Sequence, residues 1–156
     1  MRLFVLRHGK SDWGADYQRD HERPLANRGQ RAAAAMGEFL ADQGIAPEVL
    51  VTSSAVRART TLELLASAAN WAAMPVIDER LYGAGAGDVL TVAEEHRGDA
   101  ESILVCGHEP WCSGVVARLT GQHPPRFPTA TVASLSVDTL KANGATLDWL
   151  QRPRDL

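Results

Sequence analysis

Short apolar runs alternate along the chain with longer segments in which apolar residues recur at helical spacing. The apolar runs of strand length lie at residues 3–6, 48–52, 74–81 and 102–106. A helical pattern follows each run, at residues 27–43, from 53 or 54 to 69, 88–96 and 111–120. Strands that are apolar on both faces are typical of a parallel sheet with helices on each side. The alternation therefore predicts an α/β fold.

Several helix ends carry start and stop signals. Gly44 ends the helix at 27–43, and Gly121 ends the helix at 111–120. Ser53 or Ser54 is expected to cap the helix that runs to about residue 69. The apolar stripe of the 27–43 helix faces the core and consists of Ala33, Met36, Phe39 and Leu40.

The last part of the chain has a different pattern. Residues 122–129 read QHPPRFPT, which predicts a loop, and residues 131–137 alternate as a half-exposed strand does. Residues 145–150 can pair with that strand across the turn residues Asn143 and Gly144. We therefore expect a three-layer αβα sandwich with a mostly parallel central sheet and one antiparallel edge, formed by residues 1–156 as a single domain.

Composition narrows the classes of protein. The chain has 156 residues, 45% hydrophobic and 22% charged, with a net charge of −3. A general nucleic-acid binder usually carries a large basic surface, so we expect no nucleic acid as partner. No segment approaches the ~20 apolar residues that span a bilayer, and no targeting segment is evident. We expect a cytoplasmic, monomeric protein without membrane contact.

The two cysteines predict neither a disulfide framework nor a metal centre. Cys106, His108 and Cys112 lie close together in sequence, but their spacing matches none of the usual zinc patterns. Cys106 lies in the most hydrophobic of the apolar runs. We expect both cysteines to be buried, reduced thiols.

Charged residues follow the first apolar run directly. Arg7, His8 and Gly9 come at the point where the strand at 3–6 is expected to end, in the crevice where open α/β sheets bind ligands. An arginine offers forked donors to a phosphoryl group, and a neutral imidazole can attack phosphorus. Gly9 permits a sharp turn and leaves room for an anion. The cationic neighbour disfavours protonation of His8.

Arg57 and His108 suit the same phosphoryl chemistry as Arg7 and His8. Arg57 falls in the first turn of its helix, where a cation is unfavourable unless an anion lies between it and the free N–H groups. His108 follows the strand at 102–106, as His8 follows the first strand. Arg23 lies in a polar loop at 12–25, and from composition alone it reads as a solvated charge.

These motifs together resemble the histidine phosphatase superfamily, the phosphoglycerate mutase-like proteins. They are Arg7-His8-Gly9, Arg57 within SSAVRARTT, and Gly107-His108. The opening RHGKSDW, the segment DHERPL followed by Arg28-Gly29, and the short length look like the SixA-type phosphohistidine phosphatases. The resemblance spans nearly the whole chain in the right order.

The resemblance implies a mechanism with two displacements at phosphorus. His8 becomes a phosphohistidine, oriented by a hydrogen bond from its other ring nitrogen to the Gly9 carbonyl, and water then releases phosphate. The catalytic residues are then His8, His108, Arg7 and Arg57. The expected phosphate-binding set is Arg7, Gly9, Arg23, Arg57 and a protonated His108. Such a site needs no metal and no cofactor.

A missing acid points to the substrate. Relatives that cleave phosphate esters usually present a carboxylic acid after the third strand or beside the second histidine. Here Tyr82, Gly83 and Ala84 follow Leu81, and Glu109 beside His108 can be a capping charge. An alkoxide needs a proton to leave, whereas imidazole, with a pKa of about 6.5, leaves more easily. The carboxylates that remain candidate acids are Asp12, Asp78, Glu79 and Glu109.

The short loops predict an open site. Such a site admits a phosphohistidine on another protein, such as a phosphotransfer domain, with Trp13 and Trp111 expected to line the mouth. His123 and Arg126 can also reach a ligand. Two alternatives stay open: a phosphatase or mutase acting on small phosphate esters, and a non-catalytic module that binds phosphate.

Overall fold

A mixed sheet of six strands forms the centre of the computed structural model, which describes residues 1–156. The strands are β1 Arg2–Arg7, β2 Val49–Thr52, β3 Pro75–Ile77, β4 Ser102–Gly107, β5 Val132–Val137 and β6 Ala145–Gln151. The α-helices are α1 Asn27–Asp42, α2 Val56–Ala68, α3 Ala86–Arg97 and α4 Trp111–Thr120. Three short 3-10 turns are η1 Asp20–Glu22, η2 Glu79–Leu81 and η3 Pro153–Asp155.

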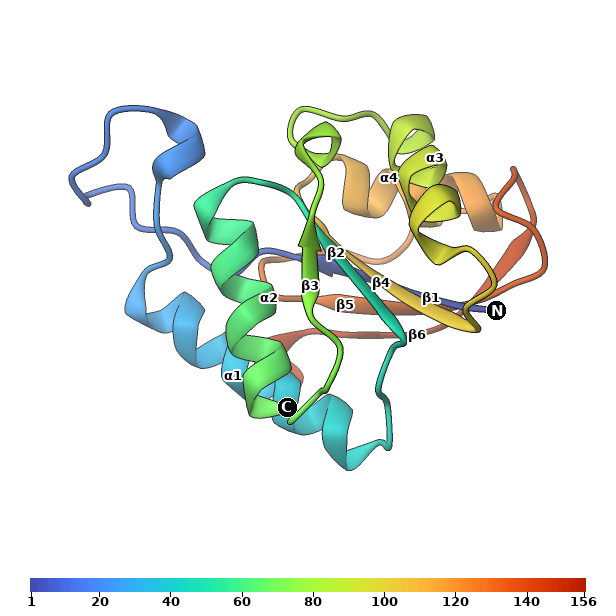
Figure 1. Ribbon diagram of the computed structural model, residues 1–156, viewed down its shortest axis with the longest axis horizontal. Helices are drawn as coiled ribbons and strands as arrows, with labels where there is room; N and C mark the ends of the chain where they lie inside the picture. The colour runs from blue at the N-terminus through green and yellow to red at the C-terminus, as the bar shows by residue number, and fades with distance from the viewer.

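The strands lie in the order β3-β2-β4-β1-β5-β6. β1 to β4 are mutually parallel, whereas β5 runs antiparallel to β1 and β6 antiparallel to β5. α1 and α2 lie on one side of the sheet and α3 and α4 on the other (Figure 1). The predicted fold, a mostly parallel α/β sheet with an antiparallel edge, is confirmed.

Alternate residues of the central strand explain the two layers of core. Leu3 and Val5 join the cluster of side chains from α3 and α4, whereas Phe4 and Leu6 join the cluster from α1 and α2. All four are buried. Because burying one such side chain stabilises the fold by roughly 1.5–3 kcal/mol, β1 is held firmly between both layers.

The third strand is shorter than predicted. It covers residues 75–77 instead of 74–81, because Asp78 turns the chain into η2 and its side chain accepts the backbone N–H of Arg80 at 3.0 Å. β3 lies at one edge of the sheet, and Val76 and Ile77 are exposed there.

The start of α2 also differs from the prediction. The N-cap residue is Ala55, which has no capping side chain, and neither Ser53 nor Ser54 occupies that position. The hydroxyl groups of the two serines pair instead with His108 and His21, respectively. Arg57 nevertheless falls in the first turn, as predicted.

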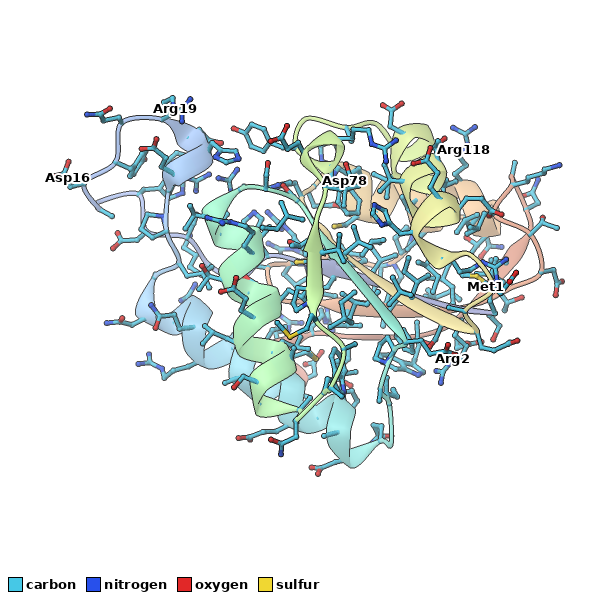
Figure 2. The ribbon with its side chains drawn as sticks, viewed as in Figure 1. Met1, Arg2, Asp16, Arg19, Asp78 and Arg118 are labelled. Carbon is cyan, nitrogen blue, oxygen red and sulfur yellow. The ribbon has the colours of Figure 1, made fainter.

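The loop after β1 is fixed against the start of α1. The Ala26 N–H donates to the Lys10 carbonyl at 2.9 Å, and a Cβ on Gly29 would lie 2.2 Å from that same oxygen. Only a glycine permits this approach. Beyond it the loop projects from the body of the molecule, carrying Asp16 and Arg19 (Figure 2).

Candidate active site

A hollow of about 540 Å³ lies where β1 and β4 end. Because Arg7 of β1 pairs with Gly107 of β4, the residues that follow, His8 and His108, lie side by side with ring centroids 5.2 Å apart. Five predicted residues from four segments of the chain line the hollow: Arg7, His8, Arg23, Arg57 and His108. A larger hollow of about 700 Å³, which Met1 and Arg118 help to line, contains no histidine or cysteine.

His8 is a buried, neutral imidazole. Its Nδ1 lies 2.7 Å from the Gly9 carbonyl oxygen, as predicted. A carbonyl only accepts, so Nδ1 carries the proton and Nε2 keeps a lone pair. Burial lowers the pKa of His8 to about 4; the Gly9 bond opposes the shift, and the charges of Arg57, Arg7 and Arg23 add to it. Nε2 is therefore a free nucleophile at neutral pH.

Gly9 differs from its predicted role. Its N–H donates to the Thr61 hydroxyl at 2.9 Å, and the residue does not line the hollow. A Cβ on Gly9 would lie 2.9 Å from the carbonyl oxygen of Gly29. Close packing against α1, and not room for an anion, accounts for this glycine.

Hydrogen bonds to other parts of the chain hold the three arginines in position. Arg7 donates to the Phe127 carbonyl at 3.1 Å. Arg23 donates to the Ser11 hydroxyl, and its guanidinium lies 3.6 Å from the centre of the exposed Trp13 ring. Each of Arg7, Arg23 and Arg57 keeps a buried Nε–H without a partner. An anion in the hollow would offset this concentration of positive charge.

Asp20 completes the site, although its role was missed in the sequence. Its carboxylate accepts Arg23 and Arg57, each at 3.0 Å, and the hydroxyl of Tyr82 at 2.9 Å. The Asp20 carbonyl oxygen accepts a second bond from Arg57 at 2.8 Å. Burial opposes ionisation, but the bonds from Tyr82, Arg23 and Arg57 lower the pKa of Asp20 to about 2. Its position three residues before Arg23 was the available signal.

His108 is neutral in this structure, whereas the sequence led us to expect a protonated ring. Burial lowers its pKa to about 3, and repulsion from Arg57 and, in acid, from a protonated His8 adds to the shift. Its Nε2 pairs with the Ser53 hydroxyl at 2.8 Å, which fixes the ring and leaves Nδ1 unpaired. The participation of Ser53 was also missed, because a serine before a helix reads first as a cap.

No carboxylate stands free in the hollow to act as an acid. Glu109 lines it but accepts both the N–H and the hydroxyl of Ser113, at 2.7 and 2.8 Å, and so caps α4. Asp78 pairs with Arg80 and with the half-buried His96. Asp12 accepts the Gly14 N–H, and Glu79 lies in η2; neither lines the hollow.

Tyr82 occupies the position after the third strand where a carboxylic acid could have protonated a leaving alkoxide. Its ring meets His108 edge-on, with centroids 5.7 Å apart, and it helps to line the hollow. Burial, together with the hydrogen bond to the Asp20 carboxylate, raises the pKa of the phenol above its ordinary value. Tyr82 is therefore a weaker acid than an ordinary tyrosine.

Trp13, Trp111 and the two cysteines differ in their exposure. Both tryptophans line the hollow, as predicted. Trp13 is 66% exposed at the rim, whereas Trp111 is buried and its indole N–H donates to the Leu81 carbonyl at 3.0 Å. Cys106 and Cys112 are buried free thiols, as predicted, and burial raises the pKa of both.

No cluster of three His, Cys, Asp or Glu side chains is arranged to hold a metal ion. None of the helices has the length and apolar character that crossing a membrane requires.

Comparison with known proteins places these features in context. The family model for the histidine phosphatase superfamily (branch 1) matches residues 3–91. Phosphohistidine phosphatase SixA of Escherichia coli K12 is 30% identical over 160 residues, covering 100% of this chain and 96% of that protein. A solved structure of the protein histidine phosphatase SixA complexed with tungstate is 28% identical, covers 99% of both chains and gives a TM-score of 0.88.

The same architecture occurs in a more distant protein. A mycobacterial glucosyl-3-phosphoglycerate phosphatase is 19% identical, with coverage of 95% of this chain and 97% of its own and a TM-score of 0.68. At that level of identity the likeness concerns the fold alone.

Proposed function

The chain belongs to the histidine phosphatase superfamily and is a phosphatase, and from that premise we propose that its substrate is a phosphohistidine carried by another protein. The SixA relative, aligned over the whole of this chain, supports this substrate class. The observation that carries the proposal is the combination of a neutral, oriented His8 with a hollow in which no carboxylate is free.

The first displacement uses the free lone pair of His8. Nε2 attacks phosphorus in line with the substrate's phosphorus–nitrogen bond, and that bond breaks. The departing ring keeps the electron pair and leaves as neutral imidazole after taking a proton from solvent on its other nitrogen. Nδ1–H of His8 stays bonded to the Gly9 carbonyl, which stabilises the positive charge on the phosphorylated ring.

The second displacement regenerates the enzyme. Water attacks the phosphorus on His8, the bond between phosphorus and Nε2 breaks, and Nε2 recovers its lone pair as inorganic phosphate leaves. His108, held by Ser53, offers its unpaired Nδ1 to a phosphoryl oxygen or to the attacking water. No step needs a strong acid, because the leaving group of each displacement is an imidazole: the substrate's ring in the first and the ring of His8 in the second.

The charge in the hollow suits a phosphoryl dianion. The guanidinium groups of Arg7, Arg23 and Arg57 carry three positive charges and the Asp20 carboxylate removes one, while the charges of Lys10 and Glu109, which line the same hollow, offset each other. With both histidines neutral, two positive charges remain to face two negative ones. We therefore propose a metal-independent reaction in which the arginines bind the non-transferring oxygens. The tungstate bound in the SixA structure is a tetrahedral oxyanion of the same kind.

The test compares substrate classes under one set of conditions. Purified protein is offered a phosphohistidine-bearing protein and a panel of phosphate esters, with a metal chelator present, and phosphate release is followed. We expect preferential loss of phosphohistidine, abolished in His8→Ala. Faster turnover of the esters would assign the chain to small-molecule phosphatases, and binding without turnover would leave only a phosphate-binding module.

A further inference from the structure

Two further hollows adjoin the catalytic one. A hollow of about 600 Å³ lies between the 123–129 loop and the start of α1, and another of about 590 Å³ lies between α1 and residues 152–156. Lys10 and Thr129 line all three hollows. The surface beside His8 is therefore continuous from the catalytic hollow to the C-terminal residues, which lie next to α1 (Figure 1).

This surface is strongly basic in a protein whose net charge is −3. Glu109, which is hydrogen-bonded to Ser113, is the only acidic side chain that lines either added hollow. Outside the catalytic residues the cations are Lys10, Arg28, Arg31, Arg126, Arg152 and Arg154, which we call the basic surface. The first four are exposed and take part in none of the ion pairs of the chain.

The position of Arg28 is unfavourable within the free protein. It lies in the first turn of α1, which contains no acidic residue, where the helix dipole disfavours a cation. Because Gly29 lies against the Lys10 carbonyl, the cationic residues Lys10 and Arg28 also lie next to each other. An anionic surface docked here would offset both effects.

Arg126 stands on a rigid loop. Pro124, Pro125 and Pro128 restrict the backbone, and the buried Phe127 anchors it while its carbonyl accepts Arg7 of the catalytic hollow. A loop that is already ordered loses little conformational entropy when a partner binds. The loop thus holds one more cation in a fixed place relative to His8.

We propose that the basic surface docks a protein domain that carries carboxylates around its phosphohistidine. The proposal rests on the function proposed above, because a phosphohistidine that enters the catalytic hollow must bring its neighbouring protein surface against these cations. A small phosphate ester is contained within the catalytic hollow and would not reach Arg31 or Arg154. Complementary charge at such a rim raises the rate of association and makes it sensitive to salt.

The test removes charge from the basic surface without touching the catalytic residues. The double variant Arg28→Gln/Arg126→Gln is compared with the control Arg118→Gln/Lys141→Gln. The control loses the same charge from the separate hollow of about 700 Å³, near Arg118 and Met1 (Figure 2). Binding of an unphosphorylated histidine phosphotransfer domain with an acidic face is measured by fluorescence anisotropy. Turnover is measured on the phosphorylated domain and on free phosphohistidine.

We expect the Arg28/Arg126 variant to bind the domain about tenfold more weakly and to show a matching rise in KM, with turnover of free phosphohistidine unchanged. The difference from wild type should shrink at 1 M salt, where the screening length is only about 3 Å. The Arg118/Lys141 variant should behave as wild type.

Equal losses in both double variants, or no loss in either, would overturn the docking surface even if phosphohistidine turnover is normal. Tighter binding of anionic lipid vesicles or a single-stranded RNA than of the acidic domain would overturn it in favour of another partner. Binding that depends on Arg28 and Arg126 without any turnover would uphold the surface and overturn the proposed catalytic function instead.

Discussion

The Asp20 carboxylate, in η1, lies 3.0 Å from the terminal nitrogen Nη2 of Arg57, which is 37 residues further along the chain in α2. The same carboxylate binds Arg23 and accepts Tyr82, so one acidic residue connects three walls of the hollow. Asp20 is thus a positioning residue for the two arginines, and it also sets the net charge that a phosphoryl group meets.

Asp20→Asn should lower kcat/KM by roughly tenfold. The amide has a single oxygen, so it can accept one guanidinium and must turn its NH₂ toward the other, which leaves that arginine displaced. Inhibition by inorganic phosphate should weaken in parallel. Unchanged or faster turnover in this variant would mean that the negative charge merely opposes substrate binding.

His8 should make the protein less stable in mild acid. Its pKa is about 4 in the folded state, below the ordinary value of about 6.5, so between these pH values the unfolded chain binds a proton that the folded chain does not. The free energy of unfolding should therefore fall as pH drops from 6.5 toward 4, by about 1.4 kcal/mol for each pH unit.

Urea unfolding of wild type and of His8→Gln isolates this contribution from other titrating groups. Between pH 6.5 and 5 the wild type should lose about 2 kcal/mol more stability than the variant does. Parallel curves would show that the ring of His8 is not held neutral by burial.

Gly29→Ala should disrupt both stability and activity. Helix propensity alone predicts a gain of up to about 1 kcal/mol, but the new Cβ would lie 2.2 Å from the Lys10 carbonyl oxygen. Relief of that clash must move the loop that holds His8, so we expect a net loss of 1–3 kcal/mol, on the order seen for overpacking, and at least tenfold lower kcat/KM.

Gly14→Ala is the matched control in the same loop. Its added Cβ would meet nothing closer than an Asp12 oxygen at 3.5 Å, so thermal unfolding and turnover should stay as in wild type. A stabilised, fully active Gly29→Ala protein would contradict the packing of α1 on the catalytic loop.

Trp13→Ala should weaken action on a phosphoprotein more than on free phosphohistidine. The ring is exposed at the rim and covers the Arg23 guanidinium at 3.6 Å, a contact worth about 0.5–1 kcal/mol at such sites. We expect about fivefold lower kcat/KM on the protein substrate, with Trp13→Phe restoring most of it. Equal effects on both substrates would assign Trp13 to the positioning of Arg23 alone.

The fold was predictable because apolar runs and helical periods report burial directly. The run at 3–6 gave β1 correctly, since side chains on both faces of a central strand must be apolar. β3 was predicted too long, because an edge strand is only partly buried and its pattern merges with the turn at Asp78.

The chemistry was only partly predictable. The hydrogen bond between His8 and the Gly9 carbonyl was expected from the family resemblance, and because it joins adjacent residues it needed no knowledge of the fold. The contacts of Asp20 with Arg57, of Ser53 with His108 and of Tyr82 with Asp20 span 37, 55 and 62 residues, and no local pattern reveals them. The charge of His108 depends on burial and on neighbouring cations, both of which exist only in the folded state.

The most direct measurement is a single-turnover reaction with a ³²P-labelled phosphohistidine domain, quenched in alkali and resolved by gel and by peptide mapping. We predict transient label on the enzyme at His8, which decays to inorganic phosphate and is absent from His8→Ala. Phosphate release without labelled enzyme at any time, label at another residue, or full turnover by His8→Ala would contradict it.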